Sequence, residues 1–207
     1  MDIQAIEKAY GRYVKIYDAV FGRMFLPRLR HVIEKLALSP GQIVLEVGVG
    51  TGISLPLYPA GVRVAGVDVL DTMLARAKAK LPGINARSVL LAKMDGRRLA
   101  FKDNVFDHSI VAHVVSVADN PHEILKEMQR VTRPGGSIII INHFRSENPA
   151  SLVLLKAFGP LCRKLGWHPD FALDPLIARS GLHVEDVYKL HPVDLWKIVW
   201  TKSSPRD

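Results

Sequence analysis

Three glycines and two carboxylates carry the clearest chemical signal in this chain of 207 residues. Residues 44–52 read Val-Leu-Glu-Val-Gly-Val-Gly-Thr-Gly, so an apolar run is followed by glycines at every second position. Glycines after a buried strand let the backbone turn sharply and approach a ligand closely. Asp68 follows a second apolar run, at the spacing from Gly48 where a carboxylate can accept hydrogen bonds from ribose hydroxyls. The pattern predicts a site for a nucleotide-like cofactor.

The glycine spacing excludes the dinucleotide fingerprint, whose third glycine would have to replace Ile53. Residues 46–52 instead resemble Glu-x-Gly-x-Gly-x-Gly, motif I of the class I S-adenosylmethionine-dependent methyltransferases. The resemblance implies that S-adenosylmethionine is the methyl donor and that S-adenosylhomocysteine is released. It also implies a set of cofactor-binding residues: Glu46, Gly48, Gly50, Thr51, Gly52, Asp68, Val69, Met73, Asp95, Gly96 and His113.

Two further stretches resemble the same family. Phe-Asp at 106–107 resembles the family's entry to its fourth strand, and Arg-Val-Thr-Arg-Pro-Gly-Gly at 130–136 resembles the stretch before its fifth. In the family, an acidic residue after the third strand hydrogen-bonds the adenine amino group, and Asp95 is our candidate. Met73 is placed to cover an adenine face, although it could equally be a core residue.

Asp68 and His113 also have structural interpretations. Asp68 could cap the helix that follows it, although Asp71 is better placed to do so. His113, on a strand that leads to the pocket, could orient cofactor or substrate, or it could be a hydrogen-bonded core histidine. The sequence leaves both interpretations of His113 open.

The elements that must position these residues alternate between strand and helix. This alternation predicts an α/β fold, a Rossmann-like doubly wound sheet. The family resemblance implies seven strands, mostly parallel with an antiparallel last strand. Strands are expected at 43–47, 62–67, 88–93, 106–115, 137–142, 182–190 and 193–200, and helices at 71–80 and 121–131.

The N-terminal segment 1–38 is predicted to form amphipathic helices ahead of the cofactor-binding domain at 39–207. An apolar and tyrosine stripe recurs there at steps of three and four residues, and Pro27 is expected to break the helix and start another. The segment could simply pack on the core. Alternatively, its basic side could rest in a membrane interface while the helix closes over the active site.

Most of the chain resembles the bacterial phosphatidylethanolamine N-methyltransferases. The resemblance lies in residues 9–22, 46–59 and 142–144, which are Ala-Tyr-Gly-Arg-Tyr-Val-Lys-Ile-Tyr-Asp-Ala-Val-Phe-Gly, Glu-Val-Gly-Val-Gly-Thr-Gly-Ile-Ser-Leu-Pro-Leu-Tyr-Pro and Asn-His-Phe. It implies stepwise methylation of phosphatidylethanolamine through mono- and dimethyl forms to phosphatidylcholine. An amine must lose its proton before it attacks a methyl group, which requires a nearby proton acceptor.

The acceptor side of the site is expected to use residues near the strand ends and on the tyrosine stripe. Tyr13 and Tyr17 are our candidates beside the amine, with His113 and His143 assisting orientation or proton removal. Arg145, Arg163 or Lys164 would meet the lipid phosphate. Residues 148–168 carry several apolar side chains and basic residues without an acid. The segment could be a core helix between the fifth and sixth strands or a partly exposed apolar and basic surface, and the absence of acids favours contact with an anionic surface.

Composition limits the other classes. The chain is 48% hydrophobic and 23% charged with a net charge of +8, which suits an anionic lipid surface or a nucleic acid. The single cysteine excludes an internal disulfide, and no spacing of histidine and cysteine indicates a metal site. No segment has the pattern of a signal peptide or a membrane span. We expect a cytoplasmic monomer bound peripherally to the inner leaflet of the cytoplasmic membrane.

Two rival functions share the same cofactor half. One is a methyltransferase for a quinone, another small molecule or RNA, although no RNA-binding pattern is visible and a nucleic-acid partner is therefore not expected. The other is an inactive, membrane-associated protein that binds S-adenosylmethionine.

Overall fold

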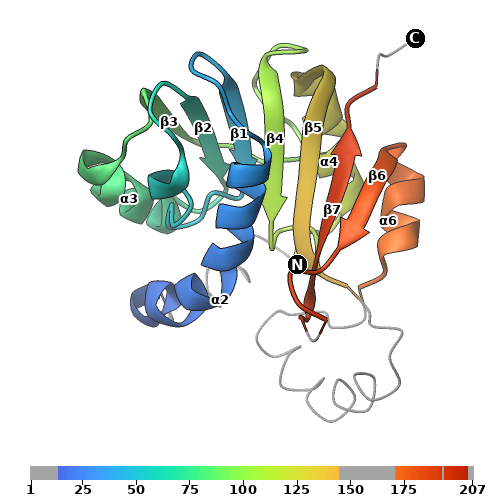
Figure 1. Cartoon of the computed structure of the whole chain (residues 1–207), viewed down its shortest axis with the longest axis horizontal. Coiled ribbons are helices and arrows are strands. Elements are labelled where there is room, and N and C mark those ends of the chain that lie inside the picture. Colours follow the sequence, from blue (N-terminus) through green and yellow to red (C-terminus); the bar gives the residue numbers. More distant parts are fainter. Residues whose placement is uncertain (1–13, 145–170, 193, 205–207) are drawn as a thin grey trace.

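Seven strands in the order β3-β2-β1-β4-β5-β7-β6 form one sheet in the computed structural model (Figure 1). The structure describes residues 14–144, 171–192 and 194–204. The strands are β1 Ile43–Val47, β2 Arg63–Asp68, β3 Ser88–Lys93, β4 Phe106–Ala112, β5 Thr132–His143, β6 His183–Tyr188 and β7 Trp196–Lys202. The helices are α2 Val14–Lys35, α3 Asp71–Lys80, α4 Pro121–Val131 and α6 Leu173–Ser180, with short 3-10 turns at Leu55–Leu57 (η1) and Leu81–Gly83 (η2).

The sheet has the predicted topology. β1 pairs in parallel with β2 and β4, and β2–β3 and β4–β5 are also parallel. The last strand, β7, lies antiparallel to both β5 and β6. The order changes direction at β1 and β4, where ligand sites form beyond the carboxyl ends of parallel strands. The predicted fold class is therefore confirmed.

Alternate residues of each strand pack against opposite layers of helices. Val44 belongs to the core cluster that includes α2 and α3, whereas Leu45 belongs to the cluster formed with α4 and α6. Figure 1 shows α2 crossing one side of the sheet while α4 lies behind it. Because strand side chains alternate between faces, a continuous apolar run can fill both layers.

The predicted break at Pro27 is wrong, because α2 runs through it as one helix. Proline removes one backbone donor from the helix. The guanidinium of Arg28 donates to the carbonyl of Met24 on the preceding turn, and Phe25 and Leu29 anchor both sides of the proline in the core. Figure 1 shows that the helix changes direction part-way along.

Several element boundaries also differ from the prediction. β4 ends at Ala112 because His113 adopts a left-handed φ of 61°, which an extended strand does not accommodate. Asp71 is the first residue of α3 rather than its cap, and Leu70 occupies the capping position. β7 begins at Trp196, later than predicted, and continues to Lys202.

Candidate functional site

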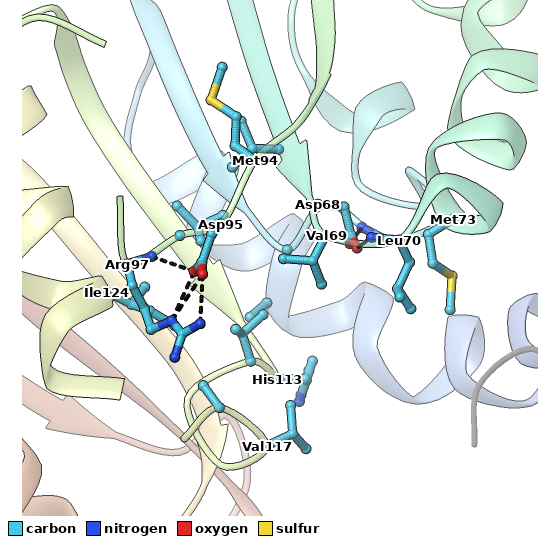
Figure 2. A pocket seen from close by; sticks show the side chains of 18 of the residues that line it. Asp68, Val69, Leu70, Met73, Met94, Asp95, Arg97, His113, Val117 and Ile124 are labelled. Atoms are coloured by element: carbon cyan, nitrogen blue, oxygen red, sulfur yellow. Dashed lines mark hydrogen bonds and ion pairs between the residues drawn. The ribbon is translucent and has the colours of Figure 1, made fainter. Parts of the chain in front are cut away.

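The main cavity lies at the carboxyl ends of β1, β2 and β4, and encloses about 980 Å³ including its open mouth. Figure 2 shows Asp95 and Asp68 on different sides of the lining, with Val69 between them in the view and His113 below both. The lining residues from the predicted set are Gly48, Gly50, Asp68, Val69, Met73, Asp95, Gly96 and His113.

The glycine loop after β1 forms one wall of this cavity. Gly48, Gly50 and Gly52 all adopt positive φ, at 75°, 56° and 71°. A Cβ on Gly48 would lie 2.1 Å from a methyl group of Val114, so a side chain cannot be accommodated there. A Cβ on Gly50 would meet nothing closer than 3.9 Å, and this residue lines the cavity. The loop thus presents bare backbone to a ligand.

Asp68 holds the loop from the end of β2. Its carboxylate accepts hydrogen bonds from the backbone N–H of Gly50 at 2.9 Å and from that of Leu70 at 2.9 Å. Burial raises the pKa of Asp68, and these backbone donors oppose the shift. A carboxylate offers about four acceptor positions, so Asp68 can still accept ribose hydroxyls.

Asp95 is paired with Arg97 on another side of the cavity (Figure 2). The guanidinium donates to both carboxylate oxygens, at 3.0 Å from Nε and 2.7 Å from Nη2 to Oδ2 and at 3.1 Å from Nε to Oδ1. Hydrogen bonding to Arg97 lowers the pKa of Asp95, which favours the ionised carboxylate. An ionised carboxylate is a suitable acceptor for an amino group such as that of adenine.

His113 combines a strained backbone with a buried, unpaired ring nitrogen. Its ring stacks on Phe25 of α2 with centroids 3.6 Å apart, and Trp196 meets its edge at 6.2 Å. Its Nε2 is buried and has no hydrogen-bond partner among the residues that the structure describes. Burial, with smaller contributions from His143 and Arg28, lowers the pKa of His113 to about 3, so the imidazole is neutral near pH 7. The interpretation of His113 as a hydrogen-bonded core histidine therefore fits the state of its Nε2 poorly.

Glu46 and its neighbours on the loop lie around a second, smaller cavity rather than the main one. Glu46, Thr51, Phe25 and His113 line this chamber on the α2 side of the glycine loop. The Glu46 carboxylate is buried and accepts hydrogen bonds from Ser54 and Tyr58. Gly52 lines neither cavity, and a Cβ there would lie 2.7 Å from Leu55 and 3.0 Å from Ala77.

Only some of the candidates for the acceptor side of the site lie among the described residues. His143 is buried at the end of β5, and the described linings of the two cavities do not include it. Tyr17 lies on α2, but its side chain falls outside the described part of the chain. The remaining candidates lie outside the described residues altogether: Tyr13, Arg145, Arg163 and Lys164. Their roles stay predictions.

Several lining residues were absent from the predicted set. Arg97 has no sequence signal of its own, because an arginine two positions after an aspartate is common. The loop after β4 contributes Val114, Val117 and Ala118. Of these three, only Val114 lay inside the predicted strand at 106–115, and it is in the loop instead. A non-glycine residue with positive φ at 113 could not be foreseen from its type. Ser54 and Tyr58 lay inside the quoted glycine motif but received no role.

The described residues also bear on whether the protein has a metal site or a membrane-spanning helix. Among the described residues, no group of three histidine, cysteine, aspartate or glutamate side chains is placed to hold a metal ion. No helix in the same part of the chain is long and apolar enough to cross a bilayer.

The sheet order, the glycine loop and the two carboxylates define a class I methyltransferase. A family model described as a methyltransferase domain matches residues 45–140. The chain is 38% identical over 197 residues to a phosphatidylethanolamine N-methyltransferase of Cereibacter sphaeroides, covering 95% of this chain and 96% of that protein. The chain therefore belongs to the class I S-adenosylmethionine-dependent methyltransferases, and S-adenosylmethionine is its cofactor.

Other relatives share the cofactor half or the fold. A demethylmenaquinone methyltransferase of Paenarthrobacter aurescens is 31% identical over 147 residues, which cover 68% of this chain and 56% of that protein. A methyltransferase solved with the Haloferax volcanii Trm112 activator superposes with a TM-score of 0.70 at 18% identity, covering 99% of both chains. A geranyl diphosphate methyltransferase in complex with the cofactor superposes at 0.68 with 15% identity, covering 86% and 84%.

Proposed function

We propose that the protein is a phospholipid N-methyltransferase that methylates the amine of phosphatidylethanolamine and then its mono- and dimethyl derivatives, giving phosphatidylcholine. The observation that carries the proposal is the end-to-end match to the Cereibacter sphaeroides enzyme, which extends beyond the shared methyltransferase domain. The similarity covers residues on both sides of the common domain at 45–140, and this supports a common acceptor.

The residues of the main cavity fit the adenosine part of the cofactor. Asp68 has acceptor positions left for ribose hydroxyls, and Asp95 lies on another side of the cavity, where the adenine amino group would reach it. Val69, Met73 and Gly96 also line this cavity and add apolar surface and bare backbone to it. When bound, S-adenosylmethionine supplies an activated methyl group for in-line transfer to the amine, so the protein mainly aligns donor and acceptor.

His113 is suited to the acceptor side because it lines both cavities and is neutral. A neutral imidazole can accept a hydrogen bond from the attacking amine and so orient it, whereas an imidazolium cannot. The lowered pKa makes the same imidazole a weak acceptor of the proton itself. Phe25 holds the ring by stacking at 3.6 Å. Tyr13, Tyr17 and His143 are proposed to assist beside the amine, directly or through water.

The lipid would be met at an anionic membrane surface. The net charge of +8 favours association with anionic lipid, to which each well-placed basic residue contributes about 1 kcal/mol. Arg145, Arg163 and Lys164 are the proposed phosphate partners. We propose a peripheral location on the inner leaflet of the cytoplasmic membrane, with the protein acting as a monomer and without a nucleic-acid partner.

A quinone C-methyltransferase is the second candidate, because several relatives carry demethylmenaquinone methyltransferase names. For the first of these, the aligned part covers 56% of the relative's length. This partial match is accounted for by the shared cofactor domain. The phospholipid proposal explains the similarity over the remaining residues as well.

The proposal is tested by offering purified protein and labelled S-adenosylmethionine three acceptors in parallel. These are phosphatidylethanolamine vesicles, a demethylmenaquinol in matched phosphatidylcholine vesicles, and bulk RNA. We expect label in lipid that separates as mono-, di- and trimethyl products. Label in the quinol or RNA alone would reject the lipid acceptor, and cofactor binding without any labelled product would favour an inactive binding protein.

A further inference from the structure

A buried hydrogen-bond network lies under the glycine loop and outside the main cavity. Ser54 Oγ donates to one oxygen of Glu46 and Tyr58 Oη donates to the other, both at 2.6 Å. All three side chains are almost inaccessible, at 4% for Glu46, 3% for Ser54 and 1% for Tyr58. The two hydroxyls come from residues after the loop, whereas Glu46 precedes it. The network therefore ties together the two ends of the cofactor loop.

The chamber beside this network is the continuation of the cofactor site. It shares Gly48, Gly50 and His113 with the main cavity, so a ligand that follows the loop from one cavity reaches the other. With adenosine between Asp68 and Asp95, the opposite end of S-adenosylmethionine points toward this chamber. That end carries an ammonium group. Among the described residues lining the chamber, Glu46 supplies the one carboxylate.

We infer that Ser54 and Tyr58 are positioning residues that hold Glu46 in a fixed orientation and in its charged form for binding the cofactor. Neither hydroxyl needs to touch the cofactor. A carboxylate with about four acceptor positions, two of them filled by hydroxyls, retains the capacity to meet a cation directly or through water. The inference rests on the cofactor identity and not on the lipid acceptor.

The electrostatics of the network support this role. Burial raises the pKa of Glu46, and the hydrogen bonds from Ser54 and Tyr58 act against that shift. Burial also raises the pKa of Tyr58, and the charge of Glu46 adds to it, so the phenol keeps its proton and remains a donor. Loss of either hydroxyl would let burial raise the pKa of Glu46 further, because one of the two hydrogen bonds that oppose it is gone. The carboxylate would then take up a proton at a higher pH than in the wild type.

Few other charged groups can complicate this titration. From the loop after β4, His113 lines the same chamber and has a pKa of about 3, so it stays neutral above pH 5. From α3, Lys80 donates to the carbonyl of Thr51 on the loop. From α2, the described lining side chains are Phe25 and Leu29, which do not titrate.

The test is calorimetric binding of S-adenosylhomocysteine to Tyr58→Phe at pH 7.5 and pH 5.5, where the ligand ammonium stays charged. Loss of a hydrogen bond to a charged group predicts affinity about threefold weaker at pH 7.5. Protonation of Glu46 in the variant predicts a loss of about tenfold or more at pH 5.5. Tyr188→Phe is the matched control, because its hydroxyl contacts His31 at 3.2 Å away from both cavities.

If the Tyr58 substitution only loosened the packing of the loop, the loss of affinity would not depend on pH. If Tyr58→Phe loses the same factor at both pH values, or none at either, the inference is wrong. Ser54→Ala should likewise lose more affinity at pH 5.5 than at pH 7.5. This second variant tests the inference if Tyr58→Phe does not fold. Glu46→Gln should bind weakly with the pH dependence removed. Since no acceptor is used, failure here is distinct from failure of the lipid proposal.

Discussion

The three acidic residues at the carboxyl edge of the sheet differ in what holds them. Glu46 accepts two hydroxyl donors, Asp68 accepts backbone N–H groups, and Asp95 accepts a guanidinium. Only the last two line the main cavity. Of the three acidic residues predicted to bind the cofactor, two therefore line the main cavity, and the third is hydrogen-bonded to hydroxyls from beyond the glycine loop.

His113 predicts a specific loss of stability in acid. Its folded pKa of about 3 lies below the ordinary 6.5, so as pH falls the unfolded chain binds this proton first. Stability is therefore lost between about pH 6.5 and pH 3, at up to about 1.4 kcal/mol per pH unit from this group. In urea unfolding from pH 6.5 to 4.5, His113→Gln should lose stability less steeply than wild type.

The exposed His191 provides the control for this titration. His191→Gln should leave the slope of unfolding free energy against pH unchanged. Equal slopes for wild type and His113→Gln would mean that the folded and unfolded states bind this proton alike, so that burial does not lower the pKa of His113.

Residue identities were predictable where spacing constrains them. Asp68 was found from its distance to Gly48, because two adjacent parallel strands bring those positions together. Its hydrogen bond to Gly50 was not predicted, since loop geometry decides it. Arg97 was missed because only the folded turn, and no periodicity, brings its guanidinium onto Asp95.

Two glycines with similar positive φ allow the effect of backbone strain to be told apart from the effect of a side-chain clash. Gly48 and Gly135 both have positive φ, at 75° and 79°, but only Gly48 has a neighbour in the space of a Cβ. Gly48→Ala should abolish measurable cofactor binding in calorimetry. Gly135→Ala should cost about 1 kcal/mol of stability and leave binding intact. Retained binding in Gly48→Ala would contradict the close packing of the loop on Val114.

The helix α2 is fixed to β7 by a buried ion pair. Arg28 donates through Nε to Asp194 at 2.9 Å, and its guanidinium carbon lies 4.4 Å from the ring centre of Trp196. Removing one partner of a buried pair leaves the other uncompensated. Asp194→Asn should therefore lower the free energy of unfolding by about 3–5 kcal/mol in urea titrations.

The exposed pair between Lys35 and Asp186, 3.7 Å apart, is the matched comparison on the same helix. Asp186→Asn should cost less than about 1 kcal/mol, because solvent screens exposed charges. Similar costs for the two variants would show that the Arg28 contact does not anchor α2.

Element types followed from periodicity, and element ends did not. β1 and β5 were recognisable as apolar runs, because central strands bury both faces. α4 was recognisable from its helical periodicity, because it buries one face. Pro27 misled because tertiary packing of α2 outweighs the loss of one backbone hydrogen bond. That residues 1–38 form a helical lid or membrane-contact segment within one structural domain stays a prediction. Phe25 and Leu29 of this segment belong to the main core.

For the whole molecule, the positive charge predicts salt-sensitive membrane binding. Flotation with vesicles containing an anionic lipid should recover the protein at about 0.05 M salt, and recovery should fall at about 0.5 M because the screening length shortens severalfold. Neutral vesicles should recover little protein. Recovery that is indifferent to both lipid charge and salt would exclude electrostatic attraction to the membrane.

The donor site is the feature on which the proposed reaction depends, and a crystal structure with S-adenosylhomocysteine tests it directly. We expect ribose hydroxyls within about 2.6–3.2 Å of the Asp68 carboxylate and the adenine amino group at Asp95. The homocysteine end should then enter the chamber beside Glu46. A nucleoside bound elsewhere, with Asp68 far from any sugar hydroxyl, would contradict the account.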